Sequence, residues 1–365
     1  MPTDPQPEAP IAAGGPYDGF PPAPEGVRAE GHSPWYLAYR RFLRNRLAVA
    51  FLGLFALIVV FVLAAPLWAD NVAHSGPNTT HTLEKLTIGG EKRDVVSPEG
   101  RPIGPVWLGA GGKFFLGADS RLGRDEMVRL MYGGRTSLFI GVVSGLITTV
   151  LAVVLGLLAG YFRGWTDTVI SRTLDVIWSF PVLLLGIALG IVLAVGGLKI
   201  GPLELSGGSI WIPILIIGFV TVPYMARPIR GEVLALGEKE FVEAAIAQGA
   251  GPLRVMFGEI LPNLGSTIIV FFALNIANNM LFEAGLSFLG AGVQPPNSSW
   301  GTMISVGEEL LTTAPLLAII PGTMILLTVL SLNIVGDGLR DALDPRAKVR
   351  LEAHAGIVEP EGTAV

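Results

Sequence analysis

The sequence predicts an all-α membrane protein that crosses the bilayer six times. Hydrophobic residues make up 51% of its 365 residues and charged residues only 15%, whereas soluble domains carry about a quarter charged residues. The mean hydropathy of +0.58 agrees. A helix needs about 20 apolar residues to cross about 30 Å of hydrocarbon. The apolar segments of about this length are 47–68, 137–161, 176–197, 210–226, 264–282 and 315–336.

The N-terminal part precedes the first span. Residues 1–33 are rich in Pro, Gly and Ala, which predicts a disordered tail. In segment 34–46, Trp35 and Tyr39 share a helical face opposite Arg40 and Arg41. This pattern favours a short helix in the membrane interface, although a basic, aromatic flank of the first span would have the same composition.

Two features distinguish the spans themselves. The fourth is the shortest and contains Pro213 and Pro223, which a helix bundle can accommodate by satisfying the freed backbone groups. Glycines four residues apart allow helices to approach closely, either within this bundle or against a partner subunit. Such pairs are Gly141/Gly145, Gly156/Gly160 and Gly186/Gly190.

Basic residues in the short connections predict the orientation, because cytoplasmic loops are enriched in Lys and Arg. The connection between spans three and four has only Lys199, and that between spans five and six has none. The other connections are basic: Arg40, Arg41, Arg44 and Arg46; Arg163 and Arg172; Arg227, Arg230, Lys239 and Arg254; Arg340, Arg346, Lys348 and Arg350. Both termini are therefore expected in the cytoplasm, including a tail at 351–365. Residues 69–136 then form a long extracytoplasmic loop and the segment before span two.

The sequence argues against several kinds of chemistry. There is no cysteine, which excludes disulfides and thiolate sites. The four histidines lack metal-site spacing, so no metal is expected. No lysine is followed by Ser or Thr, as a phosphate-binding loop requires, so this chain is not expected to be an ATPase or another enzyme. No basic run suggests nucleic acid.

The loop at 237–263 is the most informative segment. Residues 240–248 are rich in Ala and Glu, which predicts a short helix. Gly249 and Gly251 end it, and Pro252 suits the first turn of a second helix. A rigid, exposed helix between two spans, with a small surface at Ala244 and Ala245, can fit a groove of another protein.

This loop resembles the EAA loop of binding-protein-dependent importers. The positions that match are Glu243, Ala244, Ala245, Gly249, Leu261 and Pro262. The resemblance implies that they dock an ATPase subunit. Glu259 differs, because peptide permeases usually have a basic residue there.

Further stretches resemble the C-type permease of dipeptide, oligopeptide and nickel importers over about residues 35–350. They are 116–125, 129–138, 283–290, 294–296, 299–301 and 336–346. The resemblance implies a type I ABC importer permease fold with cytoplasmic coupling helices, whose core is 137–350. It implies residence in the inner membrane and four kinds of partner: a B-type permease, two ABC ATPases that use ATP and Mg, an extracytoplasmic solute-binding protein and the lipid bilayer. No cofactor is expected on this chain.

The substrate expected from this resemblance is a di- or oligopeptide, with nickel or another small solute as the alternative. A different class of function is a secondary transporter or channel that works without ATP. Such proteins often contain inverted repeats with broken helices, and no convincing repeat relates the two halves of this sequence.

Polar residues in the spans give the last candidates. Asn275, Asn279 and Glu283 repeat every four residues and so share one face of span five. They line either the translocation path or a hydrogen-bonded packing seam. Arg172 and Asp175 are expected to form an ion pair within one helix.

Overall fold

The computed structural model describes residues 34–119 and 122–343. The tails expected at 1–33 and 351–365 lie outside these residues. The chain begins with α1 (Pro34–Arg44) and α2 (Arg46–Leu63), which meet at Asn45. The side-chain oxygen of Asn45 accepts a hydrogen bond from the Ala48 amide at 3.1 Å and caps α2, so α1 and α2 are separate helices. A place for α1 in the membrane interface stays a prediction. The short helix α3 (Ala65–Trp68) and a π-turn (Ala69–Ala73) continue α2.

A small subdomain follows, for which the sequence predicted no structure. Strands β1 (Lys85–Ile88) and β2 (Glu91–Asp94) form an antiparallel hairpin with Lys85 opposite Asp94. A 3-10 turn lies at Trp107–Ala110. The core of this unit consists of Leu86, Val95, Phe114 and Ala118. We call residues 74–119 the cap subdomain.

The long helix α4 (Glu126–Phe162, 37 residues) contains span two. It starts well before the predicted boundary at 137, because hydropathy marks only the apolar part. Asp125 caps it, accepting from the Val128 amide at 3.1 Å. A Cβ added at Gly156 would lie 2.6 Å from Ile229, and the other glycine pairs also face elements of this chain. The glycines therefore pack the chain's own bundle.

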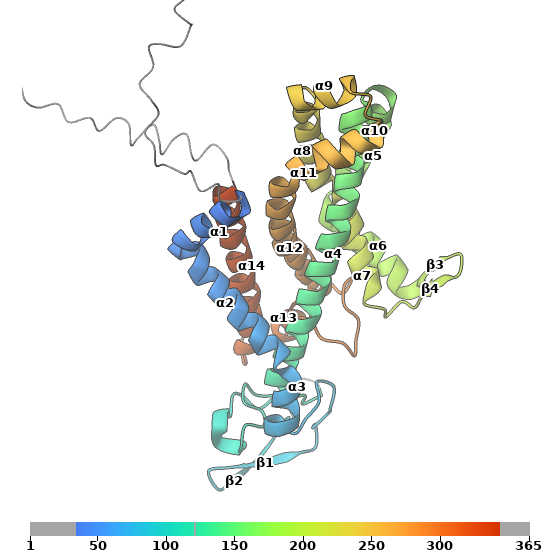
Figure 1. The fold of residues 1–365 in the computed structure, drawn as a ribbon. Coiled ribbons are helices and arrows are strands. Elements are labelled where there is room, and N and C mark those ends of the chain that lie inside the picture. The colour runs from blue at the N-terminus through green and yellow to red at the C-terminus, as the bar shows by residue number, and fades with distance from the viewer. Residues whose placement is uncertain (1–33, 120–121, 344–365) are drawn as a thin grey trace, which may run out of the picture.

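Span three is not one straight helix, and the prediction of a continuous span at 176–197 is wrong. Helices α5 (Gly164–Ser179) and α6 (Val182–Gly196) are bent by 83°. Pro181 separates them: it has no amide hydrogen and restricts Phe180 to an extended conformation. A second hairpin, β3 (Leu198–Ile200) with β4 (Leu203–Leu205), projects from the end of α6 (Figure 1).

The second half of the chain returns through the bundle three times. Its elements are α7 (Trp211–Val220), α8 (Val222–Leu236), α9 (Glu240–Ala247), α10 (Pro252–Arg254), a π-helix (Val255–Ile260), α11 (Leu261–Asn263), α12 (Gly265–Phe288), α13 (Trp300–Glu308) and α14 (Leu316–Leu343). The sequence did not predict α13, which begins at a capping box formed by Ser299 and Thr302.

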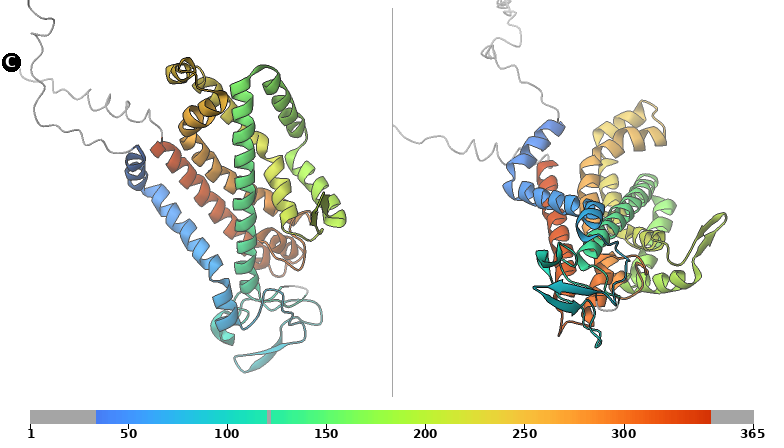
Figure 2. Two further views of the ribbon diagram at one scale, coloured as in Figure 1. Left: turned by 45° about the vertical axis from the view of Figure 1, so that its right-hand side comes forward. Right: turned by 90° about the horizontal axis from the view of Figure 1, so that it is seen from below.

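The described residues contain five helices that are long and apolar enough to cross a membrane, or six if α5 and α6 form one span. The all-α membrane fold is therefore confirmed, with two short hairpins added. Helix α1, the end of α14 and α9 all lie at one end of the bundle, which we call the α9 end (Figure 1). The cap subdomain lies at the opposite end, the cap end (Figure 1), and Figure 2 shows this arrangement from two further sides.

Candidate functional site

Local sequence determines the shape of α9. Glu240 and Glu243 lie in its first turn, where negative charge is favourable near the helix N-terminus. Gly249 follows its last turn with a φ of +85°, a left-handed conformation that suits glycine. The Gly249 amide donates to the Ile246 carbonyl at 2.9 Å and the Ala250 amide to that of Ala245 at 3.0 Å. These two bonds form a Schellman cap that stops the helix sharply.

One buried side chain attaches α9 to the bundle. Val242 is 1% exposed and belongs to the same hydrophobic cluster as Val233 on α8 and Val255, Ile260 and Leu264 after α9. The π-helix that contains Val255 and Ile260 lies against α9 and leads into α12. Val242 therefore packs α9 against both α8 and the segment that leads into α12.

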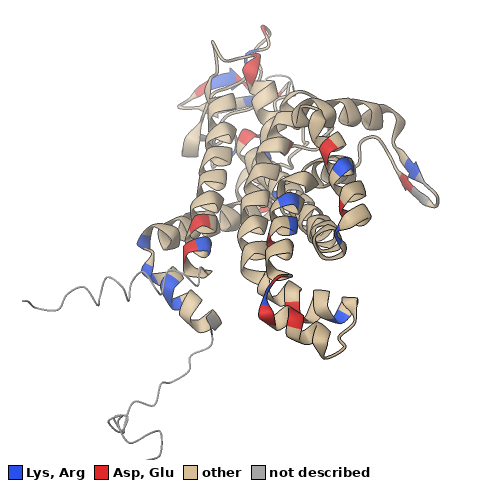
Figure 3. Ribbon diagram, turned by 90° about the horizontal axis from the view of Figure 1, so that it is seen from above, with Lys and Arg blue, Asp and Glu red and all other residues tan. Residues whose placement is uncertain are grey.

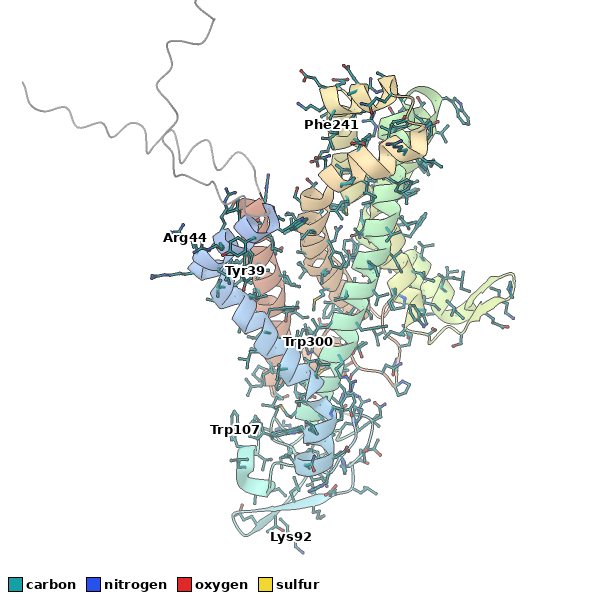
Figure 4. All side chains as sticks on the ribbon, viewed as in Figure 1. Tyr39, Arg44, Lys92, Trp107, Phe241 and Trp300 are labelled. Carbon is teal, nitrogen blue, oxygen red and sulfur yellow. The ribbon has the colours of Figure 1, made fainter. Side chains whose placement is uncertain are left out.

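The opposite side of α9 faces outward. Glu243, Ala244, Gly249 and Pro262 are exposed, while Ala245 and Leu261 are half-buried. Large apolar side chains are exposed beside them: Phe241, Ile246, Leu253 and Phe257. Figure 4 shows Phe241 at the extreme of the α9 end, far from Lys92 and Trp107 at the cap end. Exposed apolar side chains gathered next to charged ones are typical of a protein interface.

A groove runs between α9 and the ends of α4 and α8, with a cavity of about 440 Å³. Glu243 and Ile246 line one side, and Tyr161 lines the other. Arg163 and Glu238 lie in the same groove and form an ion pair at 3.1 Å. The groove can take the side chain of a docked protein at the position of Glu243.

Ion pairs between helices support this end, and reasoning from sequence missed them. Arg230 on α8 binds both carboxylate oxygens of Asp167 on α5, at 2.5 and 2.6 Å. Arg227 binds Asp175 at 2.7 Å, and the predicted ion pair of Asp175 with Arg172 is also present, at 3.9 Å. Figure 3, which looks onto this end, shows acidic and basic positions side by side. The sequence feature that could have indicated these ion pairs is the spacing of Arg227 and Arg230, which lie three residues apart on one face of α8.

The three predicted residues of α12, Asn275, Asn279 and Glu283, are buried, but they face different surroundings. The Asn275 amide points at the sulfur of Met225 (3.2 Å), and the Asn279 amide donates to the Ser144 hydroxyl (3.1 Å). Both line a cavity of about 160 Å³, together with Asn278, which the four-residue repeat did not include.

Glu283 lies instead in a seam between α4 and α12. It accepts hydrogen bonds from the hydroxyls of Ser137 at 2.8 Å and Ser287 at 2.7 Å. Its side chain is fully buried, and it is not among the residues that line the cavity. A role in the translocation path stays a prediction for all three residues. The geometry of Glu283 in this chain is that of the packing seam.

No metal centre accompanies these residues. Within 34–119 and 122–343, no three His, Asp or Glu side chains lie close enough together to hold a metal ion. The chemistry that the arrangement offers is recognition by shape and charge.

Comparison with known proteins identifies the family. Residues 152–349 match the family described as "Binding-protein-dependent transport system inner membrane component", and residues 33–82 match the "N-terminal TM domain of oligopeptide transport permease C". The "Glutathione transport system permease protein GsiD" of Pectobacterium atrosepticum is 36% identical over 87% of this chain and 92% of its own length.

Two other relatives are similarly close. The "Oligopeptide transport system permease protein OppC" of Haemophilus influenzae is 34% identical, covering 88% of this chain and 92% of the relative. The "Dipeptide transport system permease protein DppC" of Alkalihalophilus pseudofirmus is 34% identical, covering 87% and 91%. A solved chain of the MetNI methionine ABC transporter superposes with a TM-score of 0.49 at 17% identity, covering 60% of this chain and 97% of its own.

The family match extends over more than half of the chain, and the relatives share about a third of their residues over nearly their whole lengths. The protein therefore belongs to the binding-protein-dependent transport system inner membrane components, and is a multi-pass membrane permease.

Proposed function

We propose that this chain is the C-type permease subunit of an ATP-driven importer of di- or oligopeptides. The three relatives carry the names of glutathione, oligopeptide and dipeptide transport systems, which all handle short peptides. Together with a B-type permease, the chain forms half of the translocation path. An extracytoplasmic solute-binding protein delivers the substrate at the cap end.

The exposed surface of α9 carries this proposal. Two ABC ATPase subunits bind on the cytoplasmic side, and one of them docks on the surface that contains Glu243, Ala244 and Gly249. ATP and Mg are used there, and this chain binds no cofactor. Because α9, α1 and the end of α14 share one end of the bundle, both chain termini then lie in the cytoplasm.

Transport follows from differential binding. The closed ATPase pair prefers one position of α9, and a partner shifts a conformational equilibrium only by its preference for one state. The buried contact at Val242 passes this displacement to α8 and α12. The face of α12 with Asn275 and Asn279 lines the path, and Glu283 joins it if the seam with α4 opens.

The test is purification of the tagged chain from its native membrane in mild detergent, with identification of every protein recovered. We expect a P-loop ATPase and a second permease. Glu243→Arg should weaken ATPase docking by about 2 kcal/mol or more, roughly thirtyfold, as truncation of an interface hot spot does. Glu99→Arg makes the same charge change on the exposed surface near the cap end and should have no effect.

Recovery of the chain alone in several mild detergents, with an ATP analogue present, would contradict the proposal and favour a transporter that works without ATP. Unchanged ATPase recovery with Glu243→Arg would leave an importer, but with its docking surface elsewhere.

A further inference from the structure

An apolar groove opens on the side of the bundle, remote from the docking surface. It has a volume of about 790 Å³ and lies between α2 and α4. Phe55, Val59 and Val62 line it from α2, and Phe139 and Val142 from α4. Between Phe55 and Leu63 it extends for about 12 Å along α2 at 1.5 Å per residue, or about two helical turns.

Arg135 is the charged residue among those that line this groove, and the sequence indicates its depth in the membrane. No charged residue occurs between Arg135 and Arg163. At 1.5 Å per residue these two arginines are separated by about 42 Å along the helix, close to the 40–45 Å thickness of a bilayer with its headgroups. Arg135 therefore lies at the headgroup level of one leaflet, and Arg163 at that of the other.

Aromatic side chains mark the same level. Tyr132 packs in one cluster with Trp68 at the end of the first span. Trp68 lies edge-on to Phe115, with ring centroids 5.7 Å apart, and Phe115 lies edge-on to Trp107 at 5.2 Å. Trp107 is 57% exposed. Trp and Tyr concentrate at the boundary between hydrocarbon and headgroups, which agrees with the depth derived for Arg135.

The charge of Arg135 is not neutralised within the described residues. Its guanidinium is exposed and stacks on the Tyr132 ring, 5.5 Å from the centroid, and no carboxylate of residues 34–119 or 122–343 lies within ion-pair distance. A guanidinium at the headgroup level above an apolar groove is complementary to a molecule with a phosphate at one end and hydrocarbon below it.

We propose that this groove binds a membrane phospholipid. Arg135 binds the phosphate, and one acyl chain lies between α2 and α4 against Phe55, Val59 and Val142. A helix of a partner subunit is the competing occupant. A phospholipid is the better match because its phosphate supplies a counter-charge for Arg135, whose printed contact is the Tyr132 ring. The lipid site does not depend on the docking role of α9.

The absence of cysteine from the sequence permits a direct experiment. A Val59→Cys variant is labelled with bimane, and the full transporter is placed in nanodiscs that contain acyl-brominated phosphatidylglycerol or phosphatidylcholine. We expect the anionic lipid to quench Val59→Cys more strongly, with an affinity advantage of about fivefold, the effect of one basic residue near anionic lipid. Arg135→Gln should abolish this preference.

The control position is on the same helix. Leu57 is 64% exposed and does not line the groove, so bimane at Leu57→Cys should be quenched equally by both lipids, with or without Arg135→Gln. A second variant, Val142→Trp, fills the groove while keeping Arg135. Native mass spectrometry should then detect fewer retained phosphatidylglycerol molecules than with the unmodified groove.

Two results would overturn the proposal. Quenching at Val59→Cys in the isolated chain but not in the assembled transporter would show that a partner subunit occupies the groove. Equal quenching by both lipids, unaffected by Arg135→Gln and by Val142→Trp, would show only contact with bulk lipid.

Discussion

The contacts that join the helices differ between the two ends of the bundle. At the cap end, hydrogen bonds are buried: the Trp300 indole donates to the Leu130 carbonyl at 2.9 Å, and the Trp300 amide donates to the Ser137 hydroxyl at 3.2 Å. At the α9 end, partly exposed ion pairs such as Arg230 with Asp167 join the helices, and apolar side chains remain uncovered.

The buried polar network of the cap end also includes Asp125, which precedes the first turn of α4. Both oxygens of Asp125 accept from backbone amides, those of Phe114 at 2.7 Å and Val128 at 3.1 Å. Burial raises the pKa of Asp125, and these hydrogen bonds oppose the shift. Breaking a buried hydrogen bond costs more than separating a solvated ion pair. The contrast therefore indicates a cap end that resists deformation and an α9 end that can respond to a partner.

The largest effect on stability is expected at Trp300. Trp300→Ala removes a fully buried ring and its hydrogen bond, which should cost about 3–5 kcal/mol. The melting temperature in detergent should fall clearly. Trp165→Ala, near the α9 end, removes a ring that is 80% exposed and should change it little. An equal fall of the melting temperature in the two variants would contradict the proposed difference between the two ends.

A substitution of Glu283 tests whether the polar face of α12, with Asn275, Asn279 and Glu283, is a packing seam or part of the translocation path. The two oxygens of Glu283 accept one hydrogen bond each, from Ser137 and Ser287. Glu283→Gln replaces one of these oxygens by an amide NH₂ group, which should lower the stability by about 1–3 kcal/mol. We expect a lower melting temperature with unchanged transport per folded molecule in proteoliposomes. Glu308→Gln, at the exposed end of α13, is the control. Reduced transport without a loss of stability would place Glu283 in the path.

Gly249 tests the α9 end by itself. A leucine there must adopt a φ of +85°, at about 1–2 kcal/mol, although no atom lies within 4 Å of its Cβ. The last turn of α9 should fray, so transport should fall while the melting temperature stays nearly constant. The neighbouring Gly251 has a φ of −72° and equally open space. Gly251→Leu should therefore be tolerated, and a similar loss of transport there would refute the backbone explanation.

The smallest effect concerns Glu84 in the cap subdomain. Partial burial raises its pKa, but Lys113 and His81 outweigh this, and the pKa is lowered below its ordinary value of 4.5. Ionised Glu84 therefore stabilises the fold by at most about 1 kcal/mol at pH values above its ordinary pKa. This contribution is lost as the pH falls through the lowered pKa of the folded state. The difference in melting temperature between wild type and Glu84→Gln should be small at neutral pH and vanish once the pH lies below the lowered pKa of Glu84. A difference that grows on acidification would contradict this sign.

The elements that the sequence predicted are those that depend on local information. Apolar runs revealed the spans, and the Ala-Glu stretch before Gly249 revealed α9 with its end. The bend at Pro181 had a local signal too, because proline restricts the residue before it, but hydropathy alone treats the segment as continuous. The early start of α4 at Asp125 was missed for the same reason.

Contacts between distant residues could not be predicted from one sequence. Ser137 meets Glu283 across 146 positions, and Arg230 meets Asp167 across 63. No spacing rule connects such residues, so the sequence left both explanations of the polar face of α12 open. It predicted the pair of Asp175 with Arg172, which is present at 3.9 Å, but missed Arg227 on α8, which lies closer to Asp175 at 2.7 Å.

Helix α4 reaches from the cap subdomain to the groove beside α9 without a break over 37 residues, about 55 Å. If α4 pivots at the end with the buried hydrogen bonds, the cap end is its fulcrum. A rotation of roughly 5° about that fulcrum sweeps the far tip through about 5 Å, one helical turn. A small rotation of α4 at the cap end would thus displace its other end, near the proposed ATPase docking surface, by several ångströms.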